Sequence, residues 1–172
     1  KAMKGSLDIM TPYQDIVNDK SLSVNEKSEI LKDEIILVEN IKRIFLLILG
    51  KAFEKYGPEI DKNQQVLLSL SDLAIEAYLS ESTLKRTIKN IGRSSEDDQF
   101  DQINMTRLYI YEASQVVQKK SRDLINSIID VNNQDDIYSS IIEKLSYSKN
   151  PNVFDLKTKI ANKIISENKY CF

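Results

Sequence analysis

The stretch SDLAIEAYLSESTLKRT, residues 71–87, decides which fold the chain is expected to adopt. Its apolar residues Leu73, Ala77 and Leu84 recur at intervals close to the helical period, and Ser80 lies between them on the same face. The longer row on that face mixes large and small side chains: Leu70, Leu73, Ala77, Ser80, Leu84, Thr87 and Ile91. Small residues let two helix axes approach closely, while large ones fill the remaining space. We therefore expect a buried packing seam in which Ser80 and Thr87 donate their hydroxyls to preceding backbone carbonyls.

The same helical period extends over most of the chain. The expected helices run from the capping box Ser23-x-x-Glu26 to Tyr56, from Asp61 to Ile91, from Phe100 to Ile129, through Leu145 after the turn DVNNQDD, and from Asp155 to Glu167. Gly57-Pro58 is typical of a helix end, because Gly adopts the left-handed conformation and Pro cannot continue the ladder. In the third helix, large apolar residues at heptad spacing alternate with small ones: Ile103, Thr106, Ile110, Ala113, Val117, Ser121 and Leu124.

These helices predict an all-α fold, an antiparallel up-and-down bundle of three long helices plus shorter C-terminal helices. No segment shows sustained period-two alternation, and 4 Gly and 3 Pro leave few tight turns for strands. The short connections require neighbouring long helices to run antiparallel. We assign residues 23–172 to this bundle domain and residues 1–22 to a leading segment, in which Thr11-Pro12 would open a short helical stretch.

Composition excludes several classes of function. With 24 basic and 26 acidic residues the net charge is −2, so the chain lacks the basic surplus typical of nucleic-acid binders. There is no His, which rules out histidine-dependent triads and zinc sites, and the lone Cys171 fits a reducing, cytoplasmic compartment. The run IFLLIL at 44–49 is far shorter than the roughly 20 apolar residues that cross a bilayer, so we expect a core helix buried on most sides.

The opening stretch also contains candidate chemical groups. Glu76 and Glu81 are five residues apart and diverge around the helix by roughly 140°, so they do not face one substrate as a carboxylate pair would. We expect Glu81 to pair instead with Lys85 one turn away. The Ser82-x-x-Lys85 spacing matches the core of a serine acyltransferase motif, but the partner motifs are absent from the sequence.

Two further patterns have ordinary explanations. Asp130-x-Asn132 resembles the start of a calcium loop, but Asp135 replaces the required Gly and Ile141 the required Glu. The basic residues that end the second helix complement its dipole: Lys85, Arg86, Lys89 and Arg93. These and KKSR at 119–122 leave contact with an anionic membrane surface as an open alternative. From the residues alone we assign no catalytic, cofactor-binding or metal-binding residue.

The longer stretch YGPEIDKNQQVLLSLSDLAIEAYLSESTLKRT, residues 56–87, resembles the additional C-terminal helical domain of long-form acyl-CoA dehydrogenases, the type that includes the very-long-chain enzyme. The family pattern is carried by Leu70, Ser71, Asp72, Ile75, Glu76, Tyr78, Glu81, Ser82 and Arg86. KAMKGSLDIM at 1–10 is similar to the linker that leaves the dehydrogenase core, and ENKYCF at 167–172 is similar to the C-terminus of bacterial members.

This resemblance implies a parent flavoenzyme that dehydrogenates fatty acyl-CoA at its α,β positions. In the family a glutamate abstracts the α-proton and FAD accepts the β-hydride. That glutamate stands in an aromatic-Glu-Gly-Thr motif upstream of the linker, and these 172 residues contain no Glu-Gly or Gly-Thr dipeptide. We therefore expect the catalytic base and the flavin contacts to lie upstream of Lys1, and no cofactor to bind this chain itself.

The resemblance further implies a docking role. In long-form relatives the added bundle packs on the core and covers surface that other members use to form tetramers, which leaves dimers. We thus expect a noncatalytic domain of an acyl-CoA dehydrogenase, part of a longer polypeptide and a homodimer, whose partner is the upstream core. The alternatives are a free-standing helical interaction protein and a peripheral membrane-docking module.

Overall fold

A computed structural model describes residues 26–91, 93, 96–129, 134–148 and 150–168. The elements are, in order, η2 (Glu26–Leu31), α2 (Lys32–Tyr56), η3 (Gly57–Lys62), α3 (Gln64–Asn90), α4 (Glu96–Ile128), α5 (Gln134–Lys144) and α6 (Val153–Glu167). Within these described ranges there is no strand, which confirms the prediction of an all-α fold. The capping residue Ser23, the Thr11-Pro12 segment and the Asp130-x-Asn132 pattern lie outside the described residues.

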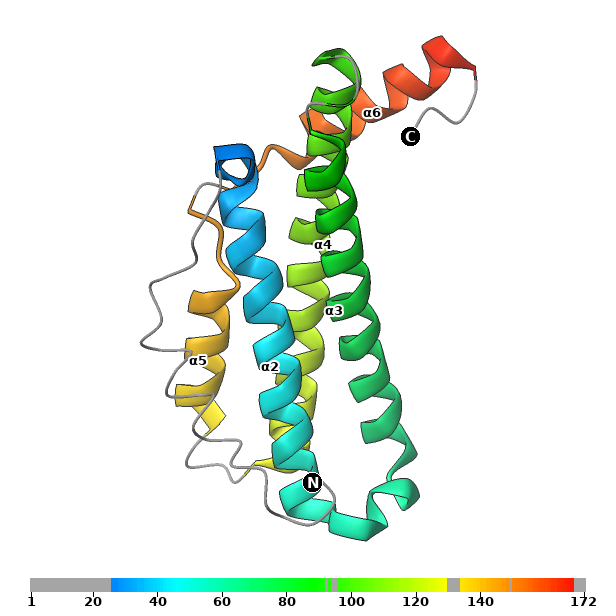
Figure 1. The fold of residues 1–172 in the computed structure, drawn as a ribbon. Coiled ribbons are helices and arrows are strands. Elements are labelled where there is room, and N and C mark those ends of the chain that lie inside the picture. The colour runs from blue at the N-terminus through cyan, green and yellow to red at the C-terminus, as the bar shows by residue number, and fades with distance from the viewer. Residues whose placement is uncertain (1–25, 92, 94–95, 130–133, 149, 169–172) are drawn as a thin grey trace.

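The three long helices form the predicted antiparallel bundle (Figure 1). α2, α3 and α4 each contact the other two, and in Figure 1 α4 lies behind the pair formed by α2 and α3. α5 packs against α2 and α4 on the side away from α3, whereas α6 crosses one end of α4 and extends away from the bundle. The shorter C-terminal helices therefore cover the α2–α4 side of the bundle and one of its ends.

Two helices begin later than expected, because 3₁₀ segments precede them. η2 occupies the turn before Lys32, and η3 occupies Gly57–Lys62, so the α-helix expected from Asp61 starts at Gln64. η3 contacts both α2 and α3 and buries Ile60 between them. A 3₁₀ turn rises more steeply per residue than an α-helix, and this tight connector directs Ile60 onto the bottom of the core.

The remaining boundaries follow local chemistry. α2 ends at Tyr56 as predicted, and Gly57 has a φ of 52°, a backbone conformation that L side chains rarely adopt. α4 starts at Glu96, four residues before the expected Phe100. α6 starts at Val153 because the Asn152 side chain accepts a hydrogen bond from the backbone N–H of Asp155 at 3.2 Å.

The predicted seam is buried throughout. Every residue of the α3 row is buried, as is every residue of the α4 heptad row, so both rows line the core. In the run at 44–49, Ile44, Leu47 and Ile48 are buried, and Phe45 and Leu49 are partly buried against the core, which agrees with the expected burial on most sides. Leu46, which is 52% exposed, is the exception. Three helices around one axis can cover only the inner faces of α2, and Leu46 lies on its outer face. No described helix is long and apolar enough to cross a membrane.

Candidate functional site

The two carboxylates of the opening stretch have separate partners. The Tyr109 hydroxyl of α4 donates a hydrogen bond to Glu76 Oε2 at 3.2 Å. Burial of the phenol, together with the negative charge of Glu76, raises the pKa of Tyr109 to about 12. This hydrogen bond connects α3 to α4. Glu76 therefore faces α4 and does not face Glu81, as the helical spacing predicts.

Glu81 lies in a small network of ion pairs between α3 and α2. Its Oε1 is 2.8 Å from Lys85 Nζ and 3.1 Å from Lys42 Nζ, and Lys42 also contacts Glu39 at 2.8 Å. The predicted pair with Lys85 is confirmed. The hydrogen bonds from Lys85 and Lys42 lower the pKa of Glu81, so this carboxylate stays ionised near neutral pH. A carboxylate held in this way is a poor general base.

The other sequence patterns do not assemble into a site. Lys85 is engaged with Glu81, which removes the base that a Ser82-x-x-Lys85 mechanism would need. In the basic KKSR segment, Lys120 pairs with Asp72 at 2.6 Å, and the Arg122 guanidinium lies over the Tyr138 ring at 4.5 Å. Among the described residues, no group of His, Cys, Asp and Glu is arranged to hold a metal ion.

The buried hydroxyls of the seam differ from expectation. The Thr87 and Thr106 hydroxyls are 2.7 Å apart across α3 and α4, and Thr106 also donates to the Gln102 carbonyl at 2.9 Å. Because the Thr106 proton is directed to Gln102, Thr87 must be the donor in the pair. Ser80 Oγ has no hydrogen-bond partner within the described structure. The prediction that Ser80 and Thr87 donate to preceding carbonyls is therefore wrong.

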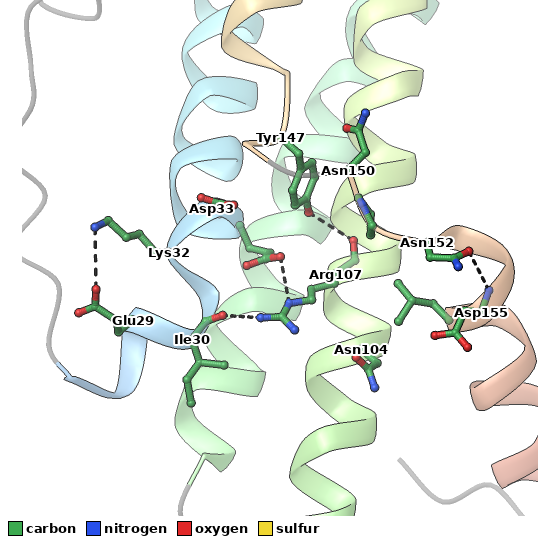
Figure 2. A pocket seen from close by; sticks show the side chains of 13 residues that line it. Glu29, Ile30, Lys32, Asp33, Asn104, Arg107, Tyr147, Asn150, Asn152 and Asp155 are labelled. Atoms are coloured by element: carbon green, nitrogen blue, oxygen red, sulfur yellow. Dashed lines mark hydrogen bonds and ion pairs between the residues drawn. The ribbon is translucent and has the colours of Figure 1, made fainter.

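A polar cavity of about 470 Å³ opens where η2 and α2 begin (Figure 2). It is enclosed by residues of η2 and α2, by Asn104 and Arg107 of α4, and by the connection from α5 to α6 together with the start of α6. Sequence reasoning missed this cavity, because its walls come from segments far apart along the chain. A polar residue at position 34 of an otherwise apolar helical face was the one available signal.

The centre of the cavity wall is an ion pair between Glu34 and Arg107. Glu34 is 3% exposed, and its Oε1 lies 3.4 Å from Arg107 Nε. Arg107 Nη2 donates to the Ile30 carbonyl at 2.7 Å, and the Tyr147 hydroxyl donates to the Arg107 carbonyl at 3.3 Å. These contacts join η2, α2, α4 and the segment after α5 at one point, which we call the Glu34–Arg107 clamp.

Burial dominates the electrostatics of this clamp. Desolvation raises the pKa of Glu34 above its ordinary value, and the Arg107 charge only partly offsets it. Desolvation and the nearby Glu34 carboxylate raise the pKa of the Tyr147 phenol, so Tyr147 remains a hydrogen-bond donor. The clamp thus fixes the geometry of this end of the bundle.

The charge of the cavity lining disfavours negatively charged ligands. Four carboxylates line it (Glu29, Asp33, Glu34 and Asp155) against two cations, Lys32 and Arg107. Arg107 already binds Glu34 and the Ile30 carbonyl, and Lys32 lies 3.9 Å from Glu29. A phosphate-bearing molecule such as FAD or coenzyme A would meet net negative charge here, so the residues present do not fit these groups.

A second hollow, of about 280 Å³, lies between α3 and α4. Arg86, which belongs to the quoted family pattern, lines it together with Thr83, Thr87, Asn90, Gln102, Met105, Thr106 and Tyr109. Thr87 bonds to Thr106 and Asn90 to Gln102, and the Tyr109 hydroxyl donates to Glu76. The pKa of Tyr109 is raised to about 12, so this phenol stays protonated near neutral pH. Neither hollow therefore presents a nucleophile activated by a base.

The residues of the quoted pattern fall into two groups. Leu70 is buried in the core, and the carboxylates of Asp72, Glu76 and Glu81 contact α4 or α2. Ile75 and Tyr78, by contrast, are more than half exposed although they are large and apolar or aromatic. The pattern therefore contains residues that hold the helices of the bundle together and residues that form an exposed surface.

Comparison with known proteins gives consistent matches. Residues 40–142 match the family model described as acyl-CoA dehydrogenase, C-terminal domain. A probable acyl-CoA dehydrogenase of Bacillus subtilis (strain 168) is 27% identical over 174 residues, an alignment that covers 99% of this chain and 29% of that protein. The crystal structure of an acyl-CoA dehydrogenase complexed with FAD from Bacillus anthracis is similar at a TM-score of 0.83 and 25% identity, and the match covers 100% of this chain and 30% of that one. The chain thus spans less than a third of the relatives it matches.

Proposed function

Because the chain belongs to the acyl-CoA dehydrogenase C-terminal domain family, we propose that it is the noncatalytic helical domain of an acyl-CoA dehydrogenase-like flavoenzyme. In this role it packs on an upstream core of the same polypeptide and shapes the oligomer. The parent reaction is the FAD-dependent α,β-dehydrogenation of a fatty acyl-CoA. The observation that carries the proposal is the full-length match of this bundle to 30% of an FAD-complexed dehydrogenase.

The chemistry of the described residues supports a noncatalytic role for this domain. They offer no activated nucleophile, and the acidic lining of the larger cavity does not fit FAD. The catalytic glutamate and the flavin contacts then belong to the upstream core, with residues 1–22 as the linker from that core and residues 23–172 as the bundle. We place the parent protein in the cytoplasm, as a homodimer.

The deciding experiment compares two purified proteins: the natural polypeptide with its upstream region, and the 172-residue chain. The longer protein is expected to carry a flavin absorbance spectrum that bleaches when a saturated fatty acyl-CoA is added, because substrate electrons reduce the cofactor. The 172-residue chain is expected to be helical by circular dichroism and colourless. A natural polypeptide without flavin, or a yellow 172-residue chain, would contradict the proposal.

Two further measurements test the proposed oligomeric state and the membrane-docking alternative. Light scattering on the longer protein is expected to give the mass of a dimer, and a tetramer mass would contradict the proposed effect on assembly. Co-sedimentation with liposomes, with and without anionic lipid, tests the membrane-docking alternative. Binding that increases with anionic lipid would favour that alternative, since basic residues are attracted to negative headgroups.

A further inference from the structure

Large apolar side chains are exposed together on one face of the bundle. Leu46 and Phe53 of α2 and Leu68, Ile75, Tyr78 and Leu79 of α3 are between 39% and 69% exposed. We call these six residues the α2–α3 face. Figure 1 shows that no other described helix crosses in front of α2 and α3 on the side turned away from α4.

Helical geometry makes the six residues one surface. Leu68, Ile75 and Leu79 are spaced by seven and four residues and so share the outer face of α3, opposite the buried row of Leu73, Ala77 and Leu84. On α2, Lys42, Leu46 and Phe53 share one side by the same spacing. The 3.1 Å contact between Lys42 and Glu81 shows that this side borders α3.

The same contact fixes the register of the two antiparallel helices. One turn beyond Lys42 on α2, Leu46 is level with the turn of α3 that carries Tyr78, and Phe53 is level with the turn that carries Ser71. The face therefore runs over about eleven residues of each helix, or about 16 Å. Two adjacent helices present a width of about 20 Å, which gives a patch on the order of 300 Å².

The area of this patch favours a covalently attached domain over a second copy of the chain as its binding partner. Two copies of the chain meeting through it would bury about 600 Å² in total, well below the 1,200–2,000 Å² typical of stable complexes between free proteins. Interfaces between domains of one chain begin at about 600 Å². A covalently attached domain needs less contact area, because a linker raises its effective concentration to the order of millimolar.

The charge next to the face argues against a membrane. Lys42 and Lys85 form ion pairs with Glu39 and Glu81, so two cations are matched by two carboxylates. An anionic lipid surface would gain little from cations already paired in this way. Polar residues beside an apolar centre are typical of a protein–protein contact.

From these observations we infer that the α2–α3 face is the surface through which this domain docks on the upstream part of its own polypeptide. The inference rests on the proposed function, since it takes the relatives' greater length to indicate an attached core. It adds the docking residues, with Ile75 and Tyr78 at the centre of the contact.

The test measures whether the face is covered in the natural polypeptide. Ser71 is exposed on α3 one helical turn from Ile75, and Ser71→Cys places a thiol in the face without removing an apolar side chain. Ser139→Cys is the matched control, because Ser139 is exposed on α5, across the bundle from α3. Each variant carries Cys171→Ser, and peptide mass spectrometry measures the labelling rate of each engineered thiol by a maleimide in native and denatured protein.

We expect labelling at position 71 to be at least about tenfold slower in the native than in the denatured protein, because a covered thiol reacts only when the contact opens. The control at position 139 should show no comparable slowing. Adding Ile75→Asp should restore most of the labelling at position 71, since a buried unpaired carboxylate disfavours the docked state. Equal labelling at both positions, or slow labelling that Ile75→Asp does not relieve, would overturn the inference.

A protein dilution series separates the core from a second copy. Protection by an attached core is independent of concentration, whereas protection by a second copy disappears on about hundredfold dilution through the dissociation range. Loss of protection on dilution would therefore overturn the inference. Flavin content is read separately, so failure of the proposed function and failure of this docking surface are distinguishable.

Discussion

Ser80 shows how a single buried atom affects the bundle. Its side chain is fully buried in the seam between helices, and its hydroxyl has no hydrogen-bond partner within the described residues. A buried hydroxyl without a partner loses its bonds to water and gains nothing in return, at about 1–3 kcal/mol. Ser80 is nevertheless small enough to let α3 approach its neighbours.

Ser80→Ala is expected to stabilise the protein by about 0.5–1 kcal/mol, because it removes the unpaired hydroxyl and Ala is the better helix former. Urea unfolding followed by circular dichroism measures the change in unfolding free energy. Ser71→Ala on the exposed side of α3 is the control, in which the propensity gain is accompanied only by loss of a solvent-exposed hydrogen bond from the Ser71 hydroxyl to the Leu67 carbonyl. Destabilisation by Ser80→Ala would indicate that the hydroxyl has a partner in solution.

Removing a hydroxyl from the Thr87–Thr106 pair should destabilise the protein, in contrast to Ser80→Ala. Thr87→Val keeps the shape of the side chain but removes the donor of the 2.7 Å bond, and we expect a loss of about 1 kcal/mol. Thr106→Val should lose more, because it removes the acceptor of the Thr87 hydroxyl and also the side-chain hydrogen bond to the Gln102 carbonyl. A double-mutant cycle in the same urea assay should give a coupling energy of about 0.5–1.5 kcal/mol, and additive effects would contradict the bond.

At the scale of the element, Gly57 ends α2 and begins the 3₁₀ connector. Its φ of 52° is accessible to Gly at little cost, and a Cβ added there meets nothing within 4 Å. Gly57→Ala therefore tests backbone strain without a steric clash. We expect a loss of about 1 kcal/mol or more in unfolding free energy, measured by thermal and urea unfolding. An unchanged stability would mean that the connector rearranges.

The Glu34–Arg107 clamp should make stability depend on pH. Burial raises the native-state pKa of Glu34 above its ordinary value of 4.5, so the native state binds this proton more tightly than the unfolded chain does. The Glu34 contribution to unfolding free energy is therefore full below the ordinary pKa. It decreases as pH rises through the higher native pKa and then becomes constant.

Glu34→Gln removes this titration, because the amide stays neutral at every pH. The difference in unfolding free energy between variant and wild type should thus move in favour of the variant as pH is raised from acidic to neutral. Urea unfolding at a series of pH values measures it, with Glu59→Gln on exposed η3 as the control. A difference that moves the other way would show that Arg107 lowers the pKa of Glu34 more than burial raises it.

Element boundaries show what local sequence could and could not predict. The end of α2 at Tyr56 and the break near Pro151 follow from Gly, Pro and Asn at those positions. The 3₁₀ turns at Glu26–Leu31 and Gly57–Lys62 were missed, because the choice between a 3₁₀ and an α turn depends on what the turn must contact. In η3 that contact is the burial of Ile60 against the base of the bundle.

At the scale of the whole molecule, the helices are held with unequal strength. α4 contacts α2, α3, α5 and α6, and its heptad row is buried throughout. α6 contacts α4 at one end of the bundle and buries only Leu156, while Phe154 and Ile165 are largely exposed. A helix with so little buried apolar surface gains little from its tertiary contacts.

Hydrogen exchange should show that α4 is more strongly protected than α6. Amides in the middle of α4, around Ile110 and Val117, are expected to exchange only through global unfolding. Amides of α6 around Ile160 should exchange through local opening, at least about a hundredfold faster. Mass spectrometry of peptide fragments measures both. Equal protection of the two helices would show that α6 unfolds together with the bundle.

The sequence by itself determined the all-α class, the long helices, and which face of α3 and α4 is buried. These features depend on the helical period and on Gly and Pro, and such signals lie within a few residues of one another. Likewise the divergence of Glu76 and Glu81, and the pairing of Glu81 with Lys85, follow from the geometry of one helix.

Only the tertiary structure decided which groups meet across helices. It brought Thr87 to Thr106, left Ser80 without a partner, joined Glu34 to Arg107 and Tyr147, and left Leu46, Ile75 and Tyr78 uncovered. The physical reason is that hydrogen bonding, desolvation and exposure depend on the atoms a side chain faces. In a bundle those atoms belong to another helix, whose rotation and register no single segment specifies.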